Sequence, residues 1–546
     1  MVLCPGSRSA PLTLAFLRSN QFTCYTFSDE RSAAFVGLGI AEQTKKPVVL
    51  VCTSGSAGYN FAPAVAEAFY RNIPLIVITA DRPPEWVDQL DGQTIHQQEL
   101  YGDHVKRSFN FPVAPTTEDD YWFANRMANE AINLAQAVPA GPVHINAPFR
   151  EPLYPTIQEK EHHAQPPRVI NHQPANHILS EAAWTELLTA ISGHRKILLV
   201  PGQLDSSPVL EQTLNEFQLK HRWPIVGDIL SNLHGVQGFI RRSDAFLGQM
   251  PEKLKQSLKP ELLITFGQSL VAKNLKLFLR KYKPREHWHI QPAGDAADTF
   301  QSLTRLIPVD PSYFFSELKN RLADPLMAQH VYADEWMQHE TQAQHSVEDF
   351  FAHHEPGEFA LVNKVIRALP ENCNLHLANS MSVRYANHVG LLATQKGVRI
   401  YSNRGTSGID GCSSTAVGHA LVSNAPNVLI TGDQAFFYDR NAFWHNYPLP
   451  NLFVVVLNNH GGIIFNMIDG PSSQPEAEEY FITRQGLRAR NLSEEFGFRY
   501  SEGTTLGKEF FQRSGTAHIH EIESSQNLNK SIFEAFRKQI KKSYEA

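Results

Sequence analysis

The feature that most constrains the fold lies late in the chain, within Asn427–Phe465. Two apolar runs, Val428–Ile430 and Phe453–Leu457, flank a polar and aromatic segment, Tyr438–His445, which predicts a helix. Buried strands joined by a helical crossover run parallel, and they appear in a sequence as continuous apolar runs rather than as alternating patterns. This stretch therefore predicts a parallel strand–helix–strand unit.

Both apolar runs end in polar residues, Gly432-Asp433 and Asn458-Asn459-His460-Gly461. Open α/β sheets bind ligands where the carboxyl ends of their strands meet. Asp433 offers a carboxylate oxygen, Asn459 an amide oxygen and Gly461 a backbone carbonyl. With two diphosphate oxygens and a water, these three would complete the octahedral oxygen shell of magnesium. An ordinary buried crossover with an aspartate in its turn is the alternative interpretation.

The spacing resembles the fingerprint of thiamine-diphosphate (ThDP) enzymes, in which Gly-Asp is followed after about 25 residues by Asn-Asn. One position departs from that pattern, because Gln434 stands where the generic motif has glycine. Short motifs of this kind also occur by chance, so the rest of the chain has to decide the interpretation.

Size and composition allow about three domains of ordinary globular protein. The chain has 546 residues, 42% of them hydrophobic and 19% charged, with a net charge of −6 that argues against a broad nucleic-acid surface. Its five cysteines are scattered without a CxxC pair, which indicates reduced thiols in a cytoplasmic protein. We find no apolar run of membrane-spanning length and no secretory leader, and expect neither a membrane span nor export.

Strand and helix patterns alternate along most of the chain, and this predicts the α/β class with doubly wound parallel sheets. The expected strands are Phe22–Phe27, Pro47–Cys52, Ile73–Thr79, Val143–Asn146, Ile197–Val200, Pro224–Val226, Leu262–Phe266, His287–Gln291, Asn374–Ala378, Val398–Tyr401 and the two runs above. The first expected helices are Ser32–Thr44 and Ala57–Arg71. The first and third parts of the chain share an architecture, as a duplicated ancestor would explain.

We predict three domains, at residues 1–155, 178–330 and 355–546. Residues 151–178, rich in Pro, His and Gln, are expected to form one linker. Residues 311–357 look helical and then polar, and are expected to form a second one. The chain starts abruptly, with Met1–Leu3 leading straight into a loop, so the first element of the first domain is expected to be short or missing.

Five segments together carry a more specific resemblance. They are PGSRSAPL (5–12), DER (29–31), TADRPPE (79–85), YSNRGTSGIDG (401–411) and the metal stretch itself. Over nearly the whole chain, this combination resembles the 2-succinyl-5-enolpyruvyl-6-hydroxy-3-cyclohexene-1-carboxylate (SEPHCHC) synthase family, MenD, of ThDP enzymes. The motifs distinguish this family from acetolactate synthases and pyruvate decarboxylases.

The resemblance implies a pyrimidine-binding domain, a central domain and a diphosphate-binding domain. It implies ThDP with Mg²⁺, or Mn²⁺ in its place, as cofactors, and a homodimer or homotetramer with active sites at the subunit interface. The implied reaction is decarboxylation of 2-oxoglutarate and 1,4-addition of the succinyl carbanion to isochorismate, a transferase step of menaquinone biosynthesis.

The resemblance also assigns cofactor contacts. Glu30 would hydrogen-bond N1′ of the aminopyrimidine, and burial would raise its pKa so that it shares a proton there. Ile409 would be the aliphatic wedge under the bent cofactor. The diphosphate cradles would come from Asn379–Ser382, with Ser380, and from Gly432–Phe436, with Gly432, Asp433, Ala435 and Phe436. A capping glutamate and a core isoleucine are the alternative interpretations of the first two residues.

Both implied substrates are dianions, so basic side chains should line the pocket. The matching residues are Arg8, Arg82, Lys273, Arg384 and Arg404, and the polar candidates for substrate contacts are Ser7, Gln93 and Ser380. Asn274 departs from the Lys-Arg pair expected in some relatives, so one carboxylate contact would be weaker or supplied from elsewhere. A solvated surface charge is the alternative for each basic residue.

Two rival functions remain open from the sequence. Another ThDP carboligase or decarboxylase acting on pyruvate or a branched 2-oxo acid would need a less basic pocket. A non-catalytic protein that keeps the fold would not need Glu30 or Asp433, and both are present.

Overall fold

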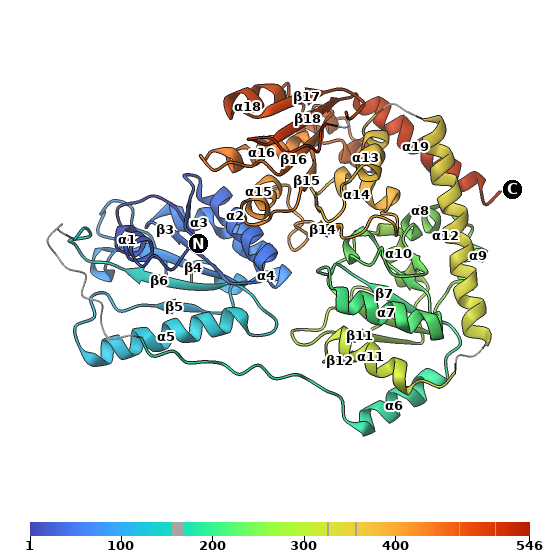
Figure 1. Cartoon of the computed structure of the whole chain (residues 1–546), viewed down its shortest axis with the longest axis horizontal. Coiled ribbons are helices and arrows are strands. Elements are labelled where there is room, and N and C mark those ends of the chain that lie inside the picture. Colours follow the sequence, from blue (N-terminus) through green and yellow to red (C-terminus); the bar gives the residue numbers. More distant parts are fainter. Residues whose placement is uncertain (156–166, 325–326, 355–356, 469, 508, 546) are drawn as a thin grey trace.

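The computed structural model describes residues 1–155, 167–324, 327–354, 357–468, 470–507 and 509–545. It contains three six-stranded sheets, and every strand pair in them is parallel. We call each sheet with its helices the first, central or third unit, in chain order; they form three lobes (Figure 1). The α/β class and the three parallel sheets predicted from the sequence are confirmed. The expected linker at 151–178 lies partly outside the described residues.

The first unit has the strand order β2-β1-β3-β4-β6-β5. Its strands are β1 (Val2–Leu3), β2 (Tyr25–Thr26), β3 (Val48–Cys52), β4 (Leu75–Asp81), β5 (Ser108–Asn110) and β6 (Val143–Pro148). Its helices are α1 (Ala10–Arg18), α2 (Glu30–Thr44), α3 (Ser56–Asn60), α4 (Ala62–Arg71) and α5 (Glu118–Gln136), with short 3-10 turns η1 (Pro84–Trp86) and η2 (Gly102–His104). The two-residue strand β1 lies between β2 and β3.

The central unit has a different order, β12-β11-β10-β7-β8-β9. Its strands are β7 (Ile197–Pro201), β8 (Ile225–Val226), β9 (Phe239–Ile240), β10 (Leu262–Phe266), β11 (Glu286–Ile290) and β12 (Arg305–Ile307). Its helices are α6 (Glu181–Ser192), α7 (Pro208–His221), η3 (Ile229–Ser231), α8 (Ser243–Gln249), α9 (Glu252–Ser257), α10 (Lys273–Lys281) and α11 (Pro311–Arg321). Separate hydrophobic clusters cover the two faces of this sheet.

The third unit repeats the order of the first, as β14-β13-β15-β16-β18-β17. Its strands are β13 (Asn374–Leu377), β14 (Arg399–Tyr401), β15 (Asn427–Gly432), β16 (Leu452–Asn458), β17 (Arg499–Glu502) and β18 (His518–Glu523). Its helical elements are α13 (Glu358–Arg367), α14 (Met381–Val389), α15 (Cys412–Val422), α16 (Asp433–Tyr438), η4 (Arg440–Phe443), α17 (Ile464–Met467), η5 (Pro471–Ser473), the π-helix η6 (Ala477–Ile482), α18 (Ala489–Glu495) and α19 (Gln526–Lys542).

Three sequence expectations are corrected. The helix expected over Ala57–Arg71 breaks at Phe61, and its second part starts with Pro63 in the first turn, where a missing N–H is tolerated. The helix expected over Tyr438–His445 instead begins at Asp433 and ends at Tyr438, followed by the turn η4. The metal candidate Asp433 is thus the first residue of a helix.

The third correction concerns residues 311–357. Helix α11 buries Phe314, Phe315 and Leu318 in the core of the central unit, so it is part of that unit. Met327–His353 then form one long helix, α12, which packs against α8 and α19 and runs from the central to the third unit (Figure 1). Its buried residues recur along one stripe despite the polar sequence, and this stripe explains why it is a packed helix rather than a loose linker.

Helices α2 and α15 join the first and third units. Gly39 and Gly418 lie at their crossing, where an added Cβ would overlap the carbonyl oxygens of Thr415 and Val36. Because no side chain separates the two backbones, one hydrophobic cluster continues from α2 through α15 into the third sheet. These helices therefore hold the two sheets of equal strand order directly against each other.

Candidate active site

The candidate metal residues converge at the carboxyl edge of the third sheet. Asp433 is 2% exposed, and its Oδ2 accepts a hydrogen bond of 2.7 Å from Nε2 of Gln485. The backbone N–H of Gly461 also donates to the Asp433 carboxylate, so the ends of β15 and β16 touch. Asn459 is 3% exposed, and its Oδ1 accepts from Nε2 of Gln526 at 3.1 Å. The structure thus brings all three predicted ligands together.

A fourth polar residue at this edge is not evident from the sequence. Glu358, the first residue of α13, is 1% exposed, and its Oε1 accepts from Nδ2 of Asn459 at 2.8 Å and from Ser524 Oγ at 3.2 Å. Burial, aided by the charge of Asp433 and opposed by the hydrogen bond from Asn459, raises the pKa of Glu358 to about 7. Its Oε2 is buried and has no hydrogen-bond partner among the described residues.

These residues fit a divalent cation. Two buried carboxyl groups, of which Asp433 raises the pKa of Glu358 through its charge, favour a positive charge beside them. Among the described residues, no three His, Cys, Asp or Glu side chains form a metal-binding group, so a cation here would rely on the oxygens of Asp433, Asn459 and Gly461. His460, which the sequence analysis did not count as a ligand, bonds Glu523 Oε1 through its Nε2 at 2.9 Å.

The predicted phosphate cradles lie beside this site. Ser380 precedes α14 with a positive φ of 73°, and its side chain makes no capping hydrogen bond. An added Cβ on Gly432 would meet no atom within 4 Å, so the backbone there is open to a ligand. Ala435 and Phe436 are buried in the following turn of α16 and can contribute only backbone groups. The residues present therefore leave space for an anionic group beside the metal candidates.

Glu30 lies at the corresponding edge of the first sheet. It is the first residue of α2, whose N-cap Asp29 accepts a hydrogen bond from the backbone N–H of Ser32. Burial raises the pKa values of the Cys4 and Cys52 thiols, and the charge of Glu30 raises them further. Glu30 thus lies close to the carboxyl ends of β1 and β3, where the sequence predicted a ligand-facing carboxylate.

Contacts within one chain bring this helix start to the third unit. Asp29 Oδ2 accepts from Asn441 Nδ2 at 2.7 Å, and Arg31 donates to the carbonyl oxygen of Tyr438 at 2.7 Å while its guanidinium lies 4.4 Å from the Tyr438 ring centroid. Tyr438 is the last residue of the helix that starts at Asp433, and Asn441 lies in the turn η4 that follows it. The segments that carry Glu30 and Asp433 therefore touch in the single chain.

The YSNRGTSGIDG loop, residues 401–411, makes a second contact with the first unit. The carboxylate of Glu67 on α4 accepts from the backbone N–H groups of Gly405 and Thr406, and Arg71 donates to the carbonyl oxygen of Ser402. Ile409 in this loop stays 37% exposed although it is a large aliphatic residue. The loop is thus fixed at its start while the predicted wedge remains uncovered.

The predicted basic residues form two groups, and no hydrogen bond or ion pair among the described residues joins one group to the other. In the first group, Arg8 is 5% exposed and donates to the Phe149 carbonyl oxygen, and both Arg8 and Arg82 lie within 4 Å of the Glu151 carboxylate. Ser7 precedes Arg8 and is exposed. Gln93 has a positive φ of 57° in the loop that also binds Arg82 through Gly92.

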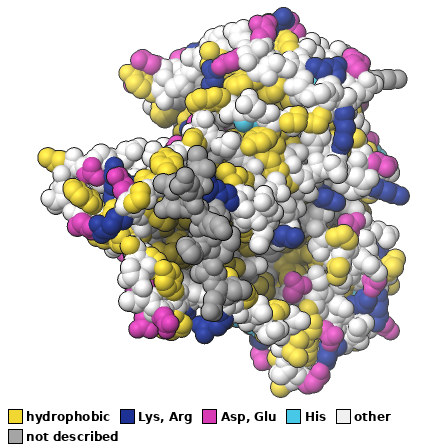
Figure 2. All heavy atoms as spheres, turned by 60° about the vertical axis from the view of Figure 1, so that its left-hand side comes forward, with side chains coloured by type: hydrophobic (Ala, Val, Ile, Leu, Met, Phe, Trp, Pro, Cys, Tyr) yellow, Lys and Arg dark blue, Asp and Glu magenta, His cyan; other side chains and the backbone are white. Residues whose placement is uncertain are grey.

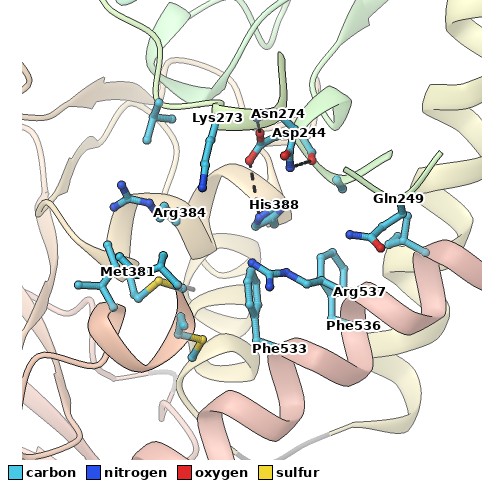
Figure 3. Close-up of a pocket in the computed structure, with 16 residues that line it drawn as sticks. Asp244, Gln249, Lys273, Asn274, Met381, Arg384, His388, Phe533, Phe536 and Arg537 are labelled. Carbon is cyan, nitrogen blue, oxygen red and sulfur yellow. Dashed lines mark hydrogen bonds and ion pairs between the residues drawn. The ribbon is translucent and has the colours of Figure 1, made fainter. Parts of the chain in front are cut away.

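The second group comprises Lys273, Arg384 and Arg404. Lys273 and Arg384 line one cavity of about 160 Å³ between the central and third units (Figure 3). Arg404 donates to Asn379 Oδ1 at 2.8 Å. Burial, followed by repulsion from Arg404, lowers the pKa of Arg384. A buried cation whose pKa is lowered by a second cation favours a bound anion.

Comparison with known proteins agrees with these features. A family model described as the N-terminal TPP binding domain of thiamine pyrophosphate enzymes matches residues 1–106, and one described as the middle domain of thiamine pyrophosphate matches residues 157–377. No helix within the described ranges is long and apolar enough to cross a bilayer. Lys, Arg, Asp and Glu side chains are intermixed on the face shown in Figure 2.

Proteins named 2-succinyl-5-enolpyruvyl-6-hydroxy-3-cyclohexene-1-carboxylate synthase align over most of the chain. The protein from Cytophaga hutchinsonii is 45% identical over 100% of this chain and 96% of its own length. Those from Flavobacterium johnsoniae and Bacteroides thetaiotaomicron are each 38% identical, over 93% and 92% of this chain and 88% and 87% of their own lengths. The chain therefore belongs to the SEPHCHC synthase family of thiamine-diphosphate enzymes.

Proposed function

We propose that this protein decarboxylates 2-oxoglutarate and adds the resulting succinyl unit to isochorismate in a 1,4-addition, which gives SEPHCHC for menaquinone biosynthesis. The similarity to SEPHCHC synthases over the whole chain supports the reaction. The observation that carries the substrate class is the group of Lys273 from the central unit and Arg384 and Arg404 from the third unit, because a cavity with basic groups beside it suits dicarboxylates.

Thiamine diphosphate and Mg²⁺ would lie at the carboxyl edge of the third sheet. Asp433, Asn459 and Gly461 would hold the cation, while Ser380 and the backbone from Gly432 to Phe436 would face the diphosphate. When bound, thiamine diphosphate supplies a nucleophilic carbon and an electron acceptor for the loss of carbon dioxide. Mg²⁺ suits the all-oxygen donors, and Mn²⁺ would be tolerated by the same set.

The protein's own groups would orient the reactants and move a proton. Glu30 would hold a proton at N1′ of the pyrimidine ring, and Ile409 would support the cofactor from below through its exposed side chain. Arg384, Arg404 and Lys273 would bind carboxylates near the metal edge, and Arg8, Arg82, Ser7 and Gln93 would bind from the first unit. Holding two dianions together in this way offsets their mutual repulsion.

The two basic groups are separate within one chain, and this separation supports a site shared between subunits. A homodimer or homotetramer would place the Arg8–Arg82 group of one subunit opposite the Lys273–Arg384–Arg404 group of another. A cytoplasmic location, and domains at residues 1–155, 178–330 and 355–546, remain part of this proposal.

The competing function is a ThDP enzyme that uses pyruvate or a branched 2-oxo acid. Steady-state assays with 2-oxoglutarate and isochorismate, compared with pyruvate alone, distinguish the two. We expect SEPHCHC to be detected by mass spectrometry only when both dianions are present. Turnover of pyruvate without them would support the rival, and a protein that neither binds ThDP–Mg²⁺ in calorimetry nor turns over would be non-catalytic.

A further inference from the structure

The cavity lined by Lys273 and Arg384 has a third basic side chain that the sequence analysis did not single out. Arg537 reaches it from α19, the last helix of the chain, whereas Lys273 comes from α10 and Arg384 from α14 (Figure 3). Three elements far apart in sequence therefore direct basic groups at one space.

Arg537 has no ion-pair partner among the described residues. Its guanidinium lies 4.7 Å from the ring centroid of Phe533, one turn earlier on the same helix, and this cation–π contact holds it over the cavity. Lys538 follows it in the chain, is also exposed, and does not line the cavity. Of these two neighbouring cations, Arg537 is therefore the one that lines the cavity.

The cavity has more positive than negative charge. Asp244 is its one acidic residue among those described, and Asp244 accepts a 2.6 Å hydrogen bond from the backbone N–H of Asn274. His388, 3.8 Å from Asp244, is neutral at pH 7, because burial, then the charges of Arg537 and Arg384, lower its pKa to about 3. Three cations therefore face one carboxylate, an excess of two positive charges that matches a dianion.

Asn274 supplies no charge to replace a second basic residue beside Lys273. Its Nδ2 donates to the Asp244 backbone carbonyl at 2.8 Å, so the side chain is turned toward α8. Arg537 is thus the cation available opposite Lys273 and Arg384 for another carboxylate.

One wall of the cavity is apolar. Phe533, Phe536 and Ile540 repeat along α19, and Met381 on α14 with Ile464 and Met467 on α17 also line the cavity. An apolar wall suits the carbon ring of a cyclic dianion better than an open-chain 2-oxo diacid. The positive charge suits either dianion, and the apolar wall favours the cyclic one.

We propose that Arg537 binds a carboxylate of the cyclic substrate, isochorismate, and so makes the C-terminal helix part of the acceptor half of the active site. This inference rests on the proposed function. It assigns Arg537 to substrate specificity and leaves cofactor binding to the residues described above.

The test compares Arg537→Gln with Lys538→Gln, which removes the neighbouring positive charge on the same helix. Steady-state kinetics at saturating 2-oxoglutarate should show KM for isochorismate raised about 10- to 150-fold in Arg537→Gln, the range for a hydrogen bond to a charged group. KM for 2-oxoglutarate and both constants of Lys538→Gln should stay within twofold of wild type. Arg537→Lys, which keeps the charge without the planar fork, should fall between.

An unchanged KM for isochorismate, or an equal rise in both KM values, would overturn the inference. Thermal unfolding of each variant identifies a folding defect, and Arg537→Lys then serves as the deciding variant. If wild type itself produces no SEPHCHC, the proposed function fails. Calorimetric titration of isochorismate into wild type and Arg537→Gln still decides the role of Arg537, and equal affinities would overturn it.

Discussion

The first and third units have the same strand order but present different polar residues at the carboxyl edges of their sheets. The first presents Glu30 beside buried thiols, together with Arg8 and Arg82, whereas the third presents Asp433, Asn459 and Gly461 with open backbone at Gly432. The sheet therefore fixes where a ligand binds, and the residues that follow each strand decide which part of the ligand it can hold. Substitutions at each edge separate the two roles, and substitutions where α2 and α15 meet test how the two units are held together.

The largest effect is expected at the third edge. Asp433→Ala removes the one carboxylate among the candidate metal ligands, so Mg²⁺-dependent ThDP affinity should fall by at least about 100-fold. That is the upper end of the loss for residues that contact a metal's ligands rather than the metal itself. Calorimetric titration measures it. Gln434→Ala, the next residue on α16, is the matched control and should bind normally; equal affinity in Asp433→Ala would remove this edge from the cofactor site.

A substitution at the carboxyl edge of the first sheet should slow the activation of the cofactor rather than weaken its binding. Glu30→Gln should slow exchange of the cofactor's C2 proton by about 10²- to 10⁴-fold, the usual contribution of a positioned acid–base group. ThDP affinity should change little, because the metal residues lie on the other sheet. Hydrogen–deuterium exchange followed by NMR measures the rate, and wild-type exchange in the variant would refute the role of Glu30.

The joint between the units contains a buried charge cluster. Glu42 accepts from Arg71 and lies 3.2 Å from Nε2 of His419, with each side chain almost fully buried. Glu42→Gln leaves the Arg71 charge unpaired, so the free energy of unfolding should fall by about 3–5 kcal/mol. Urea unfolding measures this. Lys45→Gln breaks the exposed pair with Asp205 and should cost less than about 1 kcal/mol.

The same pair predicts a pH dependence. Burial alone would raise the pKa of Glu42, but the charge of Arg71 and the hydrogen bond from His419 outweigh burial and hold it well below its usual 4.5. A lowered pKa in the folded state means that the ionised form stabilises the fold above pH 4.5 and that this contribution is lost as the pH falls below it. The stability advantage of wild type over Glu42→Gln should therefore shrink in acid; a constant difference would contradict the assignment.

The smallest effect is expected at the helix crossing. In Gly39→Ala the new methyl group would overlap the Thr415 carbonyl oxygen, so the free energy of unfolding should fall by about 1–3 kcal/mol. Gly92→Ala is the control, because a Cβ there meets no atom within 4 Å. Equal midpoints of thermal unfolding for the two variants would show that α2 and α15 can move apart at the crossing without loss of stability.

The sequence predicted the sheets better than the helices between them. The strands β15 and β16 are continuous apolar runs, and burial on both faces produces that pattern directly. The break at Phe61 and the start of α16 at Asp433 depend on the local backbone conformation, which the spacing of apolar residues does not predict. Helix α12 was expected to be part of a linker, because its buried stripe is narrow and leaves the sequence polar.

The candidate site was predicted only in part. Asp433, Asn459 and Gly461 follow strands, so their meeting at one edge could be inferred from the spacing. Glu358 and Arg537 come from helices about 75 residues or more from those ligands in sequence, and no local motif marks them; only the packing of α13 and α19 brings them to the site. The division of the basic residues into two groups likewise depends on tertiary structure.

The crossing of α2 and α15 has a mechanical consequence. At the two glycines of the crossing, backbone meets backbone and there are no rotamers to exchange, so this contact cannot flex by repacking as interlocked side chains can. The first and third sheets should therefore travel as one stiff body. An opening motion that admits a reactant is therefore expected elsewhere, between the helices α10, α14 and α19 that border the cavity.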